Sequence, residues 1–250
     1  MLRVEKLYRS SYVEEDVIVE GVMTGQKWTF TSETVANQVA NNQISNKAVV
    51  IGNGLTRNDV NLNKLIGHHS GLLGADTLQT YGCNAAHRDL NPDFLVLTSA
   101  VVAEELKNSE YRESHVVYTD HQLMTKYPGK FYLIPHNVYS DAGTLALRTA
   151  CFDGHTKVFM VGMEGHDTPG VNYNVYAGTD GYDAYKNPGD ANIKDSNTWA
   201  LDKAQVMEAY DDVEFCLVTE SGSAPTPASW AALSNFSQID IRTFVVTNDL

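Results

Sequence analysis

The feature that most limits the fold of this chain is a regular alternation of short apolar runs with helix-like segments between residues 47 and 218. Apolar runs at 47–51, 94–97 and 157–162 each stop at small or polar residues. Helix-like segments, such as 145–152, lie between them. Apolar strands that alternate with helices are typical of parallel sheets covered on both faces. The sequence therefore predicts an α/β fold with a doubly wound, mostly parallel, Rossmann-like sheet and helices on both faces.

The sequence divides into three parts. Residues 1–46 are predicted to form an N-terminal β-hairpin extension and connector, 47–220 a Rossmann-like nucleotide-binding domain, and 221–250 a C-terminal extension. A long segment, 163–198, interrupts the domain with glycine, aspartate, asparagine and tyrosine and has almost no aliphatic run. Loops of this length are usually functional or disordered. Its tyrosines are good stacking surfaces and favour an ordered loop that covers a ligand.

The N-terminal hairpin is expected to place strands at 16–20 and 27–31 on either side of a turn at 23–26. It is interpreted either as a contact in a homo-oligomer or as a lid. Strand 213–218 is expected to be the last strand of the core, and the extension is expected to hold one helix near 229–233. The other expected elements are strands at 47–51, 76–81, 94–97, 115–119, 130–134 and 157–162, and helices at 59–66, 101–106, 145–152 and 199–210.

The acidic composition of the chain limits its partners. A formal charge of −13, from 31 acidic and 18 basic residues, argues against a general nucleic-acid binder, because a phosphate backbone needs a basic surface. A single nucleotide remains compatible, since backbone donors, one arginine and a metal ion can hold it. No stretch approaches the roughly 20 apolar residues of a membrane span, and residues 1–6 lack the apolar core of a signal peptide. A cytoplasmic protein with no membrane span is expected.

The cysteines and the paired histidines predict no metal site. Cys83, Cys151 and Cys216 are far apart in sequence and stand in apolar or strand-like surroundings, which favours buried thiols over disulfides or a zinc site. His68 and His69 are adjacent, and adjacent side chains on a helix or loop do not converge on one ion.

Small and polar residues follow the predicted strands. Because the carboxyl ends of parallel strands meet at one edge of a sheet, where ligands bind, these residues predict a nucleotide site. The glycines of Gly52-Asn53-Gly54 would let backbone N–H groups approach a phosphate, although a tight strand-to-helix turn explains them equally well. Helix capping likewise explains Ser140 and Asp141. The polar segments at this edge are Gly52-Asn53-Gly54, Cys83-Asn84, Thr98-Ser99, Ser140-Asp141 and Met163-Glu164.

Three motifs in this region point to a known group of proteins. They are Val-Ile-Gly-Asn-Gly at 50–54, Tyr-Gly-Cys-Asn-Ala at 81–85, and a helix at 142–152 that leads to a strand ending in Val-Gly-Met-Glu at 161–164. Together they resemble the bacterial sialyltransferases that make lipooligosaccharide. The pattern is also similar to the archaeal 6-hydroxymethylpterin diphosphokinase (MptE-like) proteins. The resemblance covers roughly 47–218 and implies that a nucleotide lies across the carboxyl edge of the sheet.

The resemblance also implies roles for individual residues. Asn53 and Asn84 match the family's nucleotide-contacting asparagines, and Gly143 matches its helix-start glycine. Tyr173 or Tyr176 matches the loop tyrosines that hold the phosphate. Amide groups can read a ribose or a base, and phenol O–H groups stabilise phosphate charge without a cation. The predicted nucleotide-binding set also contains Gly52, Gly54, Thr56, Arg57, Ser140, Thr144 and Glu164.

The chain departs from the family pattern at several positions. Thr56-Arg57 stands where the diphosphokinases have Pro-Ser, and Arg57 could clamp a phosphate through two hydrogen bonds. Ala142 replaces the sialyltransferase serine, and Glu164 replaces the aspartate at the end of its strand while keeping a carboxylate there.

The catalytic base of the resembled family has no direct counterpart. Its histidine falls near 194–197, where this chain has none. Two residues are candidates for the catalytic base: Asp195, if desolvation raises its pKa, and His166.

Three functions follow from these observations. The first is a glycosyltransferase-like enzyme that takes a nucleotide-activated sugar as substrate, and the sequence identifies no further cofactor for it. The second is an MptE-like diphosphokinase that uses ATP and Mg²⁺, with Glu164, Asp141 and Asp167 as the available acids. The third is a non-catalytic assembly or binding module on the same fold, which the missing histidine and the N-terminal hairpin favour.

Overall fold

A single parallel sheet forms the core of the computed structural model, which describes residues 5–41, 45–62, 78–136, 140–163, 174–182 and 196–248. Within these residues the sheet has the strand order β10-β9-β8-β3-β4-β5-β6-β7, and every neighbouring pair is parallel. This confirms the predicted α/β class. The strands are β3 (Lys47–Ile51), β4 (Gln79–Cys83), β5 (Phe94–Leu97), β6 (Val116–Thr119), β7 (Tyr132–Leu133), β8 (Lys157–Val161), β9 (Glu214–Thr219) and β10 (Phe236–Asp240).

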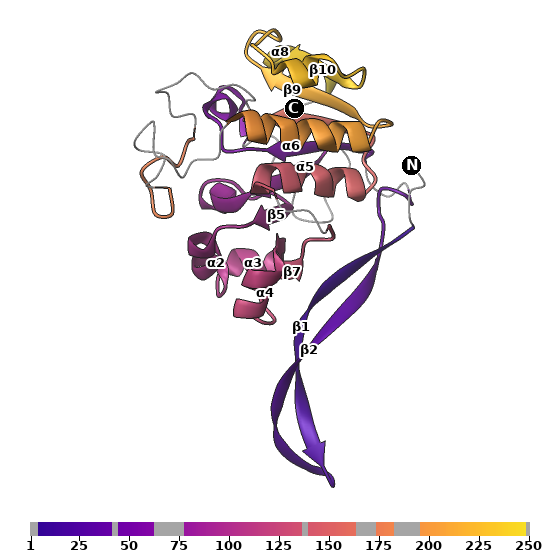
Figure 1. The fold of residues 1–250 in the computed structure, drawn as a ribbon, viewed down its shortest axis with the longest axis vertical. Helices are drawn as coiled ribbons and strands as arrows, with labels where there is room; N and C mark the ends of the chain where they lie inside the picture. Colours follow the sequence, from indigo (N-terminus) through magenta and orange to yellow (C-terminus); the bar gives the residue numbers. More distant parts are fainter. Residues whose placement is uncertain are drawn as a thin grey trace.

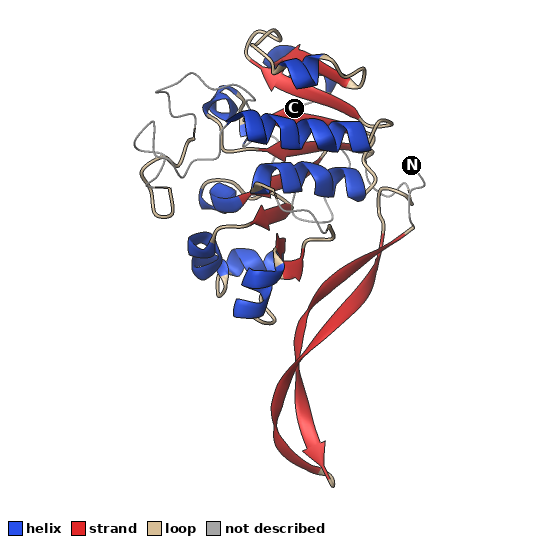
Figure 2. Ribbon diagram, in the orientation of Figure 1, coloured by secondary structure: helices blue, strands red, loops and turns tan. Residues whose placement is uncertain are grey.

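Helices cover both faces of the sheet, as the apolar strands require (Figures 1 and 2). In β3, Ala48 and Val50 pack in one core cluster with residues of α5 (Ala142–Phe152) and α6 (Ser196–Ala209). Val49 and Ile51 point the other way and pack in a cluster that contains Phe244 of α8 (Ile241–Thr247). The helices are α2 (Ala100–Leu106), α3 (Glu110–Ser114), α4 (His121–Lys126), α5 (Ala142–Phe152), α6 (Ser196–Ala209), α7 (Ala228–Ala231) and α8 (Ile241–Thr247), with 3₁₀ helices η1 (Leu55–Asp59) and η3 (Asn84–Arg88).

The strand order places a topological switch point between β3 and β8. The chain leaves β3 toward β4 on one side, whereas it leaves β8 toward β9 on the other. Connections that diverge in this way open a crevice at the carboxyl ends of the two strands, which is where open α/β sheets bind ligands. The Gly52-Asn53-Gly54 loop follows β3 and therefore lies at this point.

The N-terminal hairpin is far longer than predicted. Strand β1 (Lys6–Val19) pairs antiparallel with β2 (Val22–Ala36), and the pair projects away from the domain (Figure 1). The expected turn at 23–26 was wrong, because the chain reverses at Glu20 and Gly21, whose φ angles are +50° and +81°. Two successive positive φ angles suit the twist of a hairpin, and glycine adopts such an angle at little cost.

The C-terminal extension contributes to the sheet. Strand β10 pairs in parallel with β9 over five residues, so the prediction that the core ends with strand 213–218 was wrong. The polar residues within β10, Ser237, Gln238 and Asp240, hid it, because they leave this edge strand without a continuous apolar run. The helix expected near 229–233 is α7 (Ala228–Ala231).

Most other elements lie where the sequence predicts them. Helix α2 begins after Ser99, whose hydroxyl accepts the N–H of Val102 at 3.4 Å. The helix expected over 59–66 differs, because the first described turn there is η1, which ends at Asp59. Residues 63–77 lie outside the described part of the chain, and with them His68 and His69.

Candidate functional site

The switch point is closed by a direct backbone contact between two loops. The N–H of Gly52 donates to the carbonyl of Val161 at 2.8 Å, and the N–H of Gly54 donates to that of Gly162 at 2.9 Å. A Cβ at Gly52 would lie 2.2 Å from the Gly162 carbonyl oxygen. The two loop glycines thus let the loop after β3 lie against the end of β8. Their N–H groups, which were expected to face a phosphate, are hydrogen-bonded within the protein.

Arg57 is the central charge of this edge. It lies on η1, and its side chain is 2 % exposed. One guanidinium nitrogen donates to the Asp89 carboxylate at 2.5 Å and to the Tyr176 hydroxyl at 2.9 Å, and the Tyr176 hydroxyl itself donates to Asp89. The guanidinium carbon lies 4.8 Å from the centre of the Tyr176 ring, close enough for a cation–π interaction.

The segment 174–182 covers Arg57. Its backbone joins the loop after β3, because the N–H of Val175 donates to the Asn53 carbonyl at 2.8 Å. Its two tyrosines, Tyr176 and Tyr182, are buried. Burial and the hydrogen bond to Asp89 raise the pKa of Tyr176, so its phenol stays protonated and can donate a hydrogen bond.

Arg88 holds the same segment from the other side. Its guanidinium donates to the Thr179 hydroxyl at 2.9 Å and to the Asp180 carbonyl at 3.0 Å. It also pairs with Glu105 at 2.7 Å. The guanidinium carbon lies 5.8 Å from the ring centres of both Tyr176 and Tyr182. The segment therefore rests on two arginines rather than on the apolar core alone.

The two predicted asparagines lie at adjacent strand ends but have different partners. The Asn53 amide nitrogen lies 3.4 Å from both the Cys83 carbonyl and the Tyr182 hydroxyl. The Asn84 amide oxygen accepts the N–H groups of Thr98 and Ser99 at 2.9 and 3.3 Å. Asn84 also has a φ of +45°, a left-handed angle that asparagine tolerates better than most residues. Asn84 therefore fixes the turn after β4, whereas Asn53 faces the tyrosines.

The N-terminus of α5 provides a second polar group at this edge, in addition to the group formed by Arg57, Asp89 and Tyr176. Asp141 caps the helix by accepting the Thr144 N–H at 3.0 Å and the Thr144 hydroxyl at 2.5 Å, while Ser140 donates to Asp202 at 2.5 Å. Lys203, which is buried, lies 3.7 Å from Asp141. Burial raises the pKa of Asp141, but Lys203 and the hydrogen bonds from Thr144 outweigh it and lower the pKa overall.

Cys83 and Met163 connect the two polar groups. The Cys83 thiol is affected electrostatically by Asp141, Arg57 and Lys203 together, and burial, followed by Asp141, raises its pKa to about 12. The Cys83 thiol is therefore buried and protonated at neutral pH. The Met163 side chain reaches to within 3.6 Å of a Cβ built on Gly143 and 2.8 Å of one built on Gly52. Side-chain packing is thus continuous from the loop after β3 to α5.

The structure brings together most of the predicted nucleotide-binding residues that it describes. Asn53, Arg57 and Tyr176 converge on one another, and Thr56 lies beside them on η1. The hydroxyls of Ser140 and Thr144 have partners within the protein, and Gly143 lies in the first turn of α5. Their nucleotide roles stay predictions. Glu164, His166, Tyr173 and Asp195, and with them both candidates for the base, lie outside the described residues.

Several residues of the edge were not predicted. Asp89 and Arg88 belong to the polar run that follows β4, and this run was the available signal. For Tyr182, the available signal was its place among the tyrosines of the long segment 163–198. Lys203 and Asp202 lie on α6, where a charged pair is usually exposed, so sequence alone gave no signal that Lys203 is buried beside Asp141.

Comparison of the chain with protein-family models, with curated proteins and with solved structures gives no match. Among the described residues, no three histidine, cysteine, aspartate or glutamate side chains are grouped so that they could hold a metal ion. The helices of the described ranges include none with both the length and the apolar character needed to cross a bilayer.

Proposed function

We propose that this chain binds a nucleotide-activated sugar at the carboxyl edge of the sheet and acts as a glycosyltransferase-like enzyme. One observation carries the proposal: a buried arginine, Arg57, lies at the topological switch point beside a buried tyrosine hydroxyl, that of Tyr176. The carboxyl edge at a topological switch point is the usual nucleotide site of a doubly wound sheet. The planar guanidinium is also the side chain best shaped to hold a phosphate.

The diphosphate of the ligand would take the place that the Asp89 carboxylate occupies on Arg57. Asp89 and a phosphate are both anions that accept the same N–H groups, so they compete for one site. The Tyr176 hydroxyl, which donates to Asp89 in the free protein, would donate to the phosphate instead. Because Arg57 is 2 % exposed, the ligand reaches it only when segment 174–182 moves outward.

The base and ribose would lie near Asn53 and the two tyrosines of the covering segment. Asn53 carries both a donor and an acceptor, which suits recognition of a base edge or a ribose. The rings of Tyr176 and Tyr182 lie 5.6 Å apart between centres and offer surfaces on which a base can stack. Asn84 is expected to position the loops around this site, since its amide oxygen accepts the Thr98 N–H and so fixes the turn after β4.

A thermal-shift panel tests the binding step. The ligands are CMP, CDP, UDP, GDP, ADP and ATP, each with and without Mg²⁺. The proteins are the wild type, Asn53→Ala and Asn108→Ala. Asn108→Ala is a matched control, because Asn108 is exposed and follows the C-terminal end of α2, whereas the N-terminal end of α2 lies at the carboxyl edge of the sheet. A ligand at 100 times its Kd stabilises the folded state by about 2.7 kcal/mol. We expect one nucleotide to raise the melting temperature of the wild type and of Asn108→Ala, and to have little effect on Asn53→Ala.

The outcome also separates the proposed reaction from its alternative. A shift with a pyrimidine nucleotide, followed by release of that nucleotide when its sugar conjugate is supplied, supports sugar transfer. A shift with ATP that requires Mg²⁺ would favour the diphosphokinase alternative. If no nucleotide shifts the wild-type protein at millimolar concentration, the proposed function is wrong.

A further inference from the structure

The outer half of the N-terminal hairpin exposes an apolar, acidic tip. We define the tip as residues 16–25. Ile18 pairs with Met23 and Val19 pairs with Val22 across the two strands, and all four side chains are more than half exposed. The tip also carries Asp16 and Glu20 and has no lysine or arginine. A two-stranded hairpin is marginally stable alone in water, so a projecting one with an apolar end is expected to have a partner.

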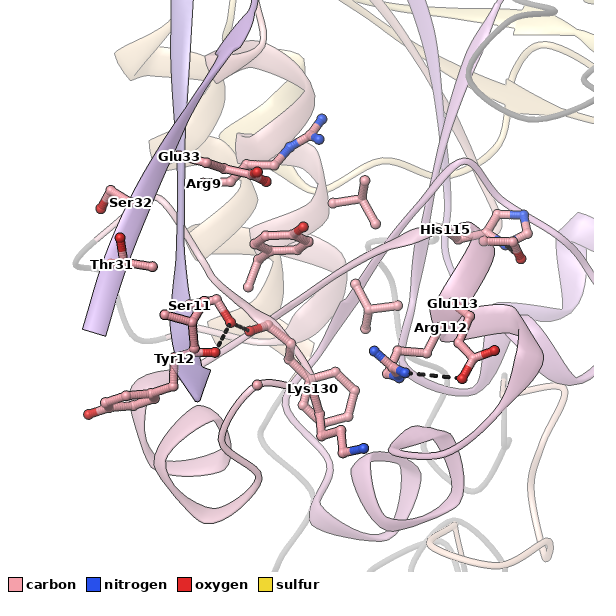
Figure 3. A pocket seen from close by; sticks show the side chains of 17 residues that line it. Arg9, Ser11, Tyr12, Thr31, Ser32, Glu33, Arg112, Glu113, His115 and Lys130 are labelled. Atoms are coloured by element: carbon pink, nitrogen blue, oxygen red, sulfur yellow. Dashed lines mark hydrogen bonds and ion pairs between the residues drawn. The ribbon is translucent and has the colours of Figure 1, made fainter. Parts of the chain in front are cut away.

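A pocket of about 610 Å³ lies at the base of the same hairpin, between β1, β2 and the β6–β7 end of the sheet. Its walls include apolar surface from Val13, Val116 and Phe131. We call it the base pocket. Figure 3 shows its polar side chains, with Arg9 beside Glu33 in one part of the view.

The base pocket carries one excess positive charge, although the whole chain has a formal charge of −13. Three cations, Arg9, Arg112 and Lys130, line it, against two carboxylates, Glu33 and Glu113. Glu113 lies 3.4 Å from Arg112 (Figure 3). Among the described residues, the Nε atoms of Arg9 and Arg112 are buried and have no hydrogen-bond partner. Guanidinium groups form strong hydrogen bonds with carboxylates, so a partner that brings carboxylates into the pocket is favoured.

The tip of the hairpin cannot reach its own base pocket. Val13 lines the pocket and Glu20 lies in the turn, and seven residues of extended strand span roughly 23 Å. Strands β1 and β2 stay paired over this length. The tip is therefore available to another molecule.

We infer that two copies of this chain form a two-fold dimer in which the hairpin tip of each copy occupies the base pocket of the other. Charge complementarity selects this occupant, since the tip brings Asp16 and Glu20 to a pocket whose three cations exceed its two carboxylates by one charge. The tip also brings apolar side chains to an apolar wall. A two-fold axis that places one tip in the partner's pocket places the second tip in the first pocket by symmetry, so the assembly closes as a dimer. Two tips would not pair with each other equally well, because both are acidic.

Sedimentation velocity of the 250-residue chain over a hundredfold concentration range tests the dimer. We expect the wild type to be dimeric, and Glu20→Lys and Arg112→Glu each to shift it toward monomer by at least tenfold in Kd. The chain that carries both substitutions restores opposite charges between tip and pocket and should regain the dimer. Glu208→Lys and Arg242→Glu are matched controls, because both residues are exposed on other helices, and both should remain dimeric.

A second measurement addresses contact directly. All three native cysteines are buried, so cysteines introduced by Met23→Cys and Lys130→Cys would be the reactive ones. A chain with Met23→Cys, mixed with a second chain that carries Lys130→Cys and then oxidised, should form a disulfide between the two copies. The Met23→Cys chain mixed with a chain that carries the exposed substitution Arg242→Cys should form none. A monomeric wild type, or a dimer that survives both charge reversals, or loss of the dimer with no rescue in the doubly substituted chain, would overturn the inference. Circular dichroism checks that each variant is folded.

Discussion

The guanidinium of Arg57 lies 2.5 Å from the carboxylate of Asp89, yet the Arg57 side chain is 2 % exposed and that of Asp89 is 51 % exposed. The cation is enclosed by the protein, and its counter-ion faces water. Once segment 174–182 moves outward, a second anion can take the place of the Asp89 carboxylate from the solvent side. This asymmetry distinguishes the pair from an ordinary surface salt bridge, which contributes little to stability.

Replacing Asp89 with asparagine should have opposite effects on stability and on nucleotide binding. Without the carboxylate, the buried Arg57 loses its counter-ion, and because Asp89 is half exposed we expect a loss of about 1–2 kcal/mol in the free energy of unfolding. The competitor of the phosphate is also gone, so nucleotide affinity should rise several-fold. Urea unfolding and calorimetric titration measure the two effects. The exposed Asp211→Asn variant is the control, and weaker nucleotide binding in Asp89→Asn would contradict the proposed phosphate position.

Gly162→Ala should destabilise the domain strongly. Gly162 has a φ of +63°, and a Cβ there would lie 2.8 Å from the Cβ of Arg57 and 3.1 Å from the Gly52 carbonyl oxygen. Alanine at this position would strain the backbone and would also overpack its neighbours. Together we expect these effects to lower the free energy of unfolding by about 2–4 kcal/mol. Gly25→Ala is the matched control, since a Cβ at Gly25 meets nothing within 4 Å. Equal unfolding midpoints for the two variants in urea would show that the switch point is not packed as described.

The stability of the wild type should fall between about pH 4 and 7 relative to Asp153→Asn. Burial raises the pKa of Asp153 to about 7, although its hydrogen bond from Tyr81, at 2.7 Å, and Arg9 act to lower it. In the unfolded chain an aspartate has a pKa of about 4. The folded state therefore retains the proton to higher pH, so stability is lost as pH rises through this window and is constant above pH 7. The slope can reach about 1.4 kcal/mol per pH unit.

Urea unfolding of both proteins at several pH values measures this difference. Asparagine at 153 can still accept the Tyr81 hydroxyl but does not titrate, so the variant should lack this part of the pH dependence. Parallel stability curves for the two proteins would mean that Asp153 is not buried in the native state.

The three thiols should resist labelling in the native protein. Cys83, Cys151 and Cys216 are each at most 5 % exposed, and burial raises the pKa of all three. Only thiolates react readily, so both access and ionisation are restricted. We expect a thiol reagent at pH 8 to label almost no cysteine in buffer and all three in urea. Rapid labelling of the native chain would show that the described packing opens readily.

The sequence alone determined the class of fold and the edge of the sheet that carries polar residues. Apolar runs such as 94–97 are buried on both sides and specify strands without reference to the rest of the chain, and glycines such as Gly52 mark where strands end. For the same reason β5 and α2 were predicted almost to the residue. Local periodicity and capping need only neighbouring residues, so they can be read from the chain.

Only the tertiary structure decided what those residues contact. That the Gly52 and Gly54 N–H groups bond to the loop after β8, and that Arg57 pairs with Asp89 under Tyr176, depends on segments more than thirty residues apart. The edge strand β10 was missed for a related reason, since its pairing with β9 outweighs its polar composition. Long-range contacts of this kind follow from the packing of the whole chain, and no local pattern encodes them.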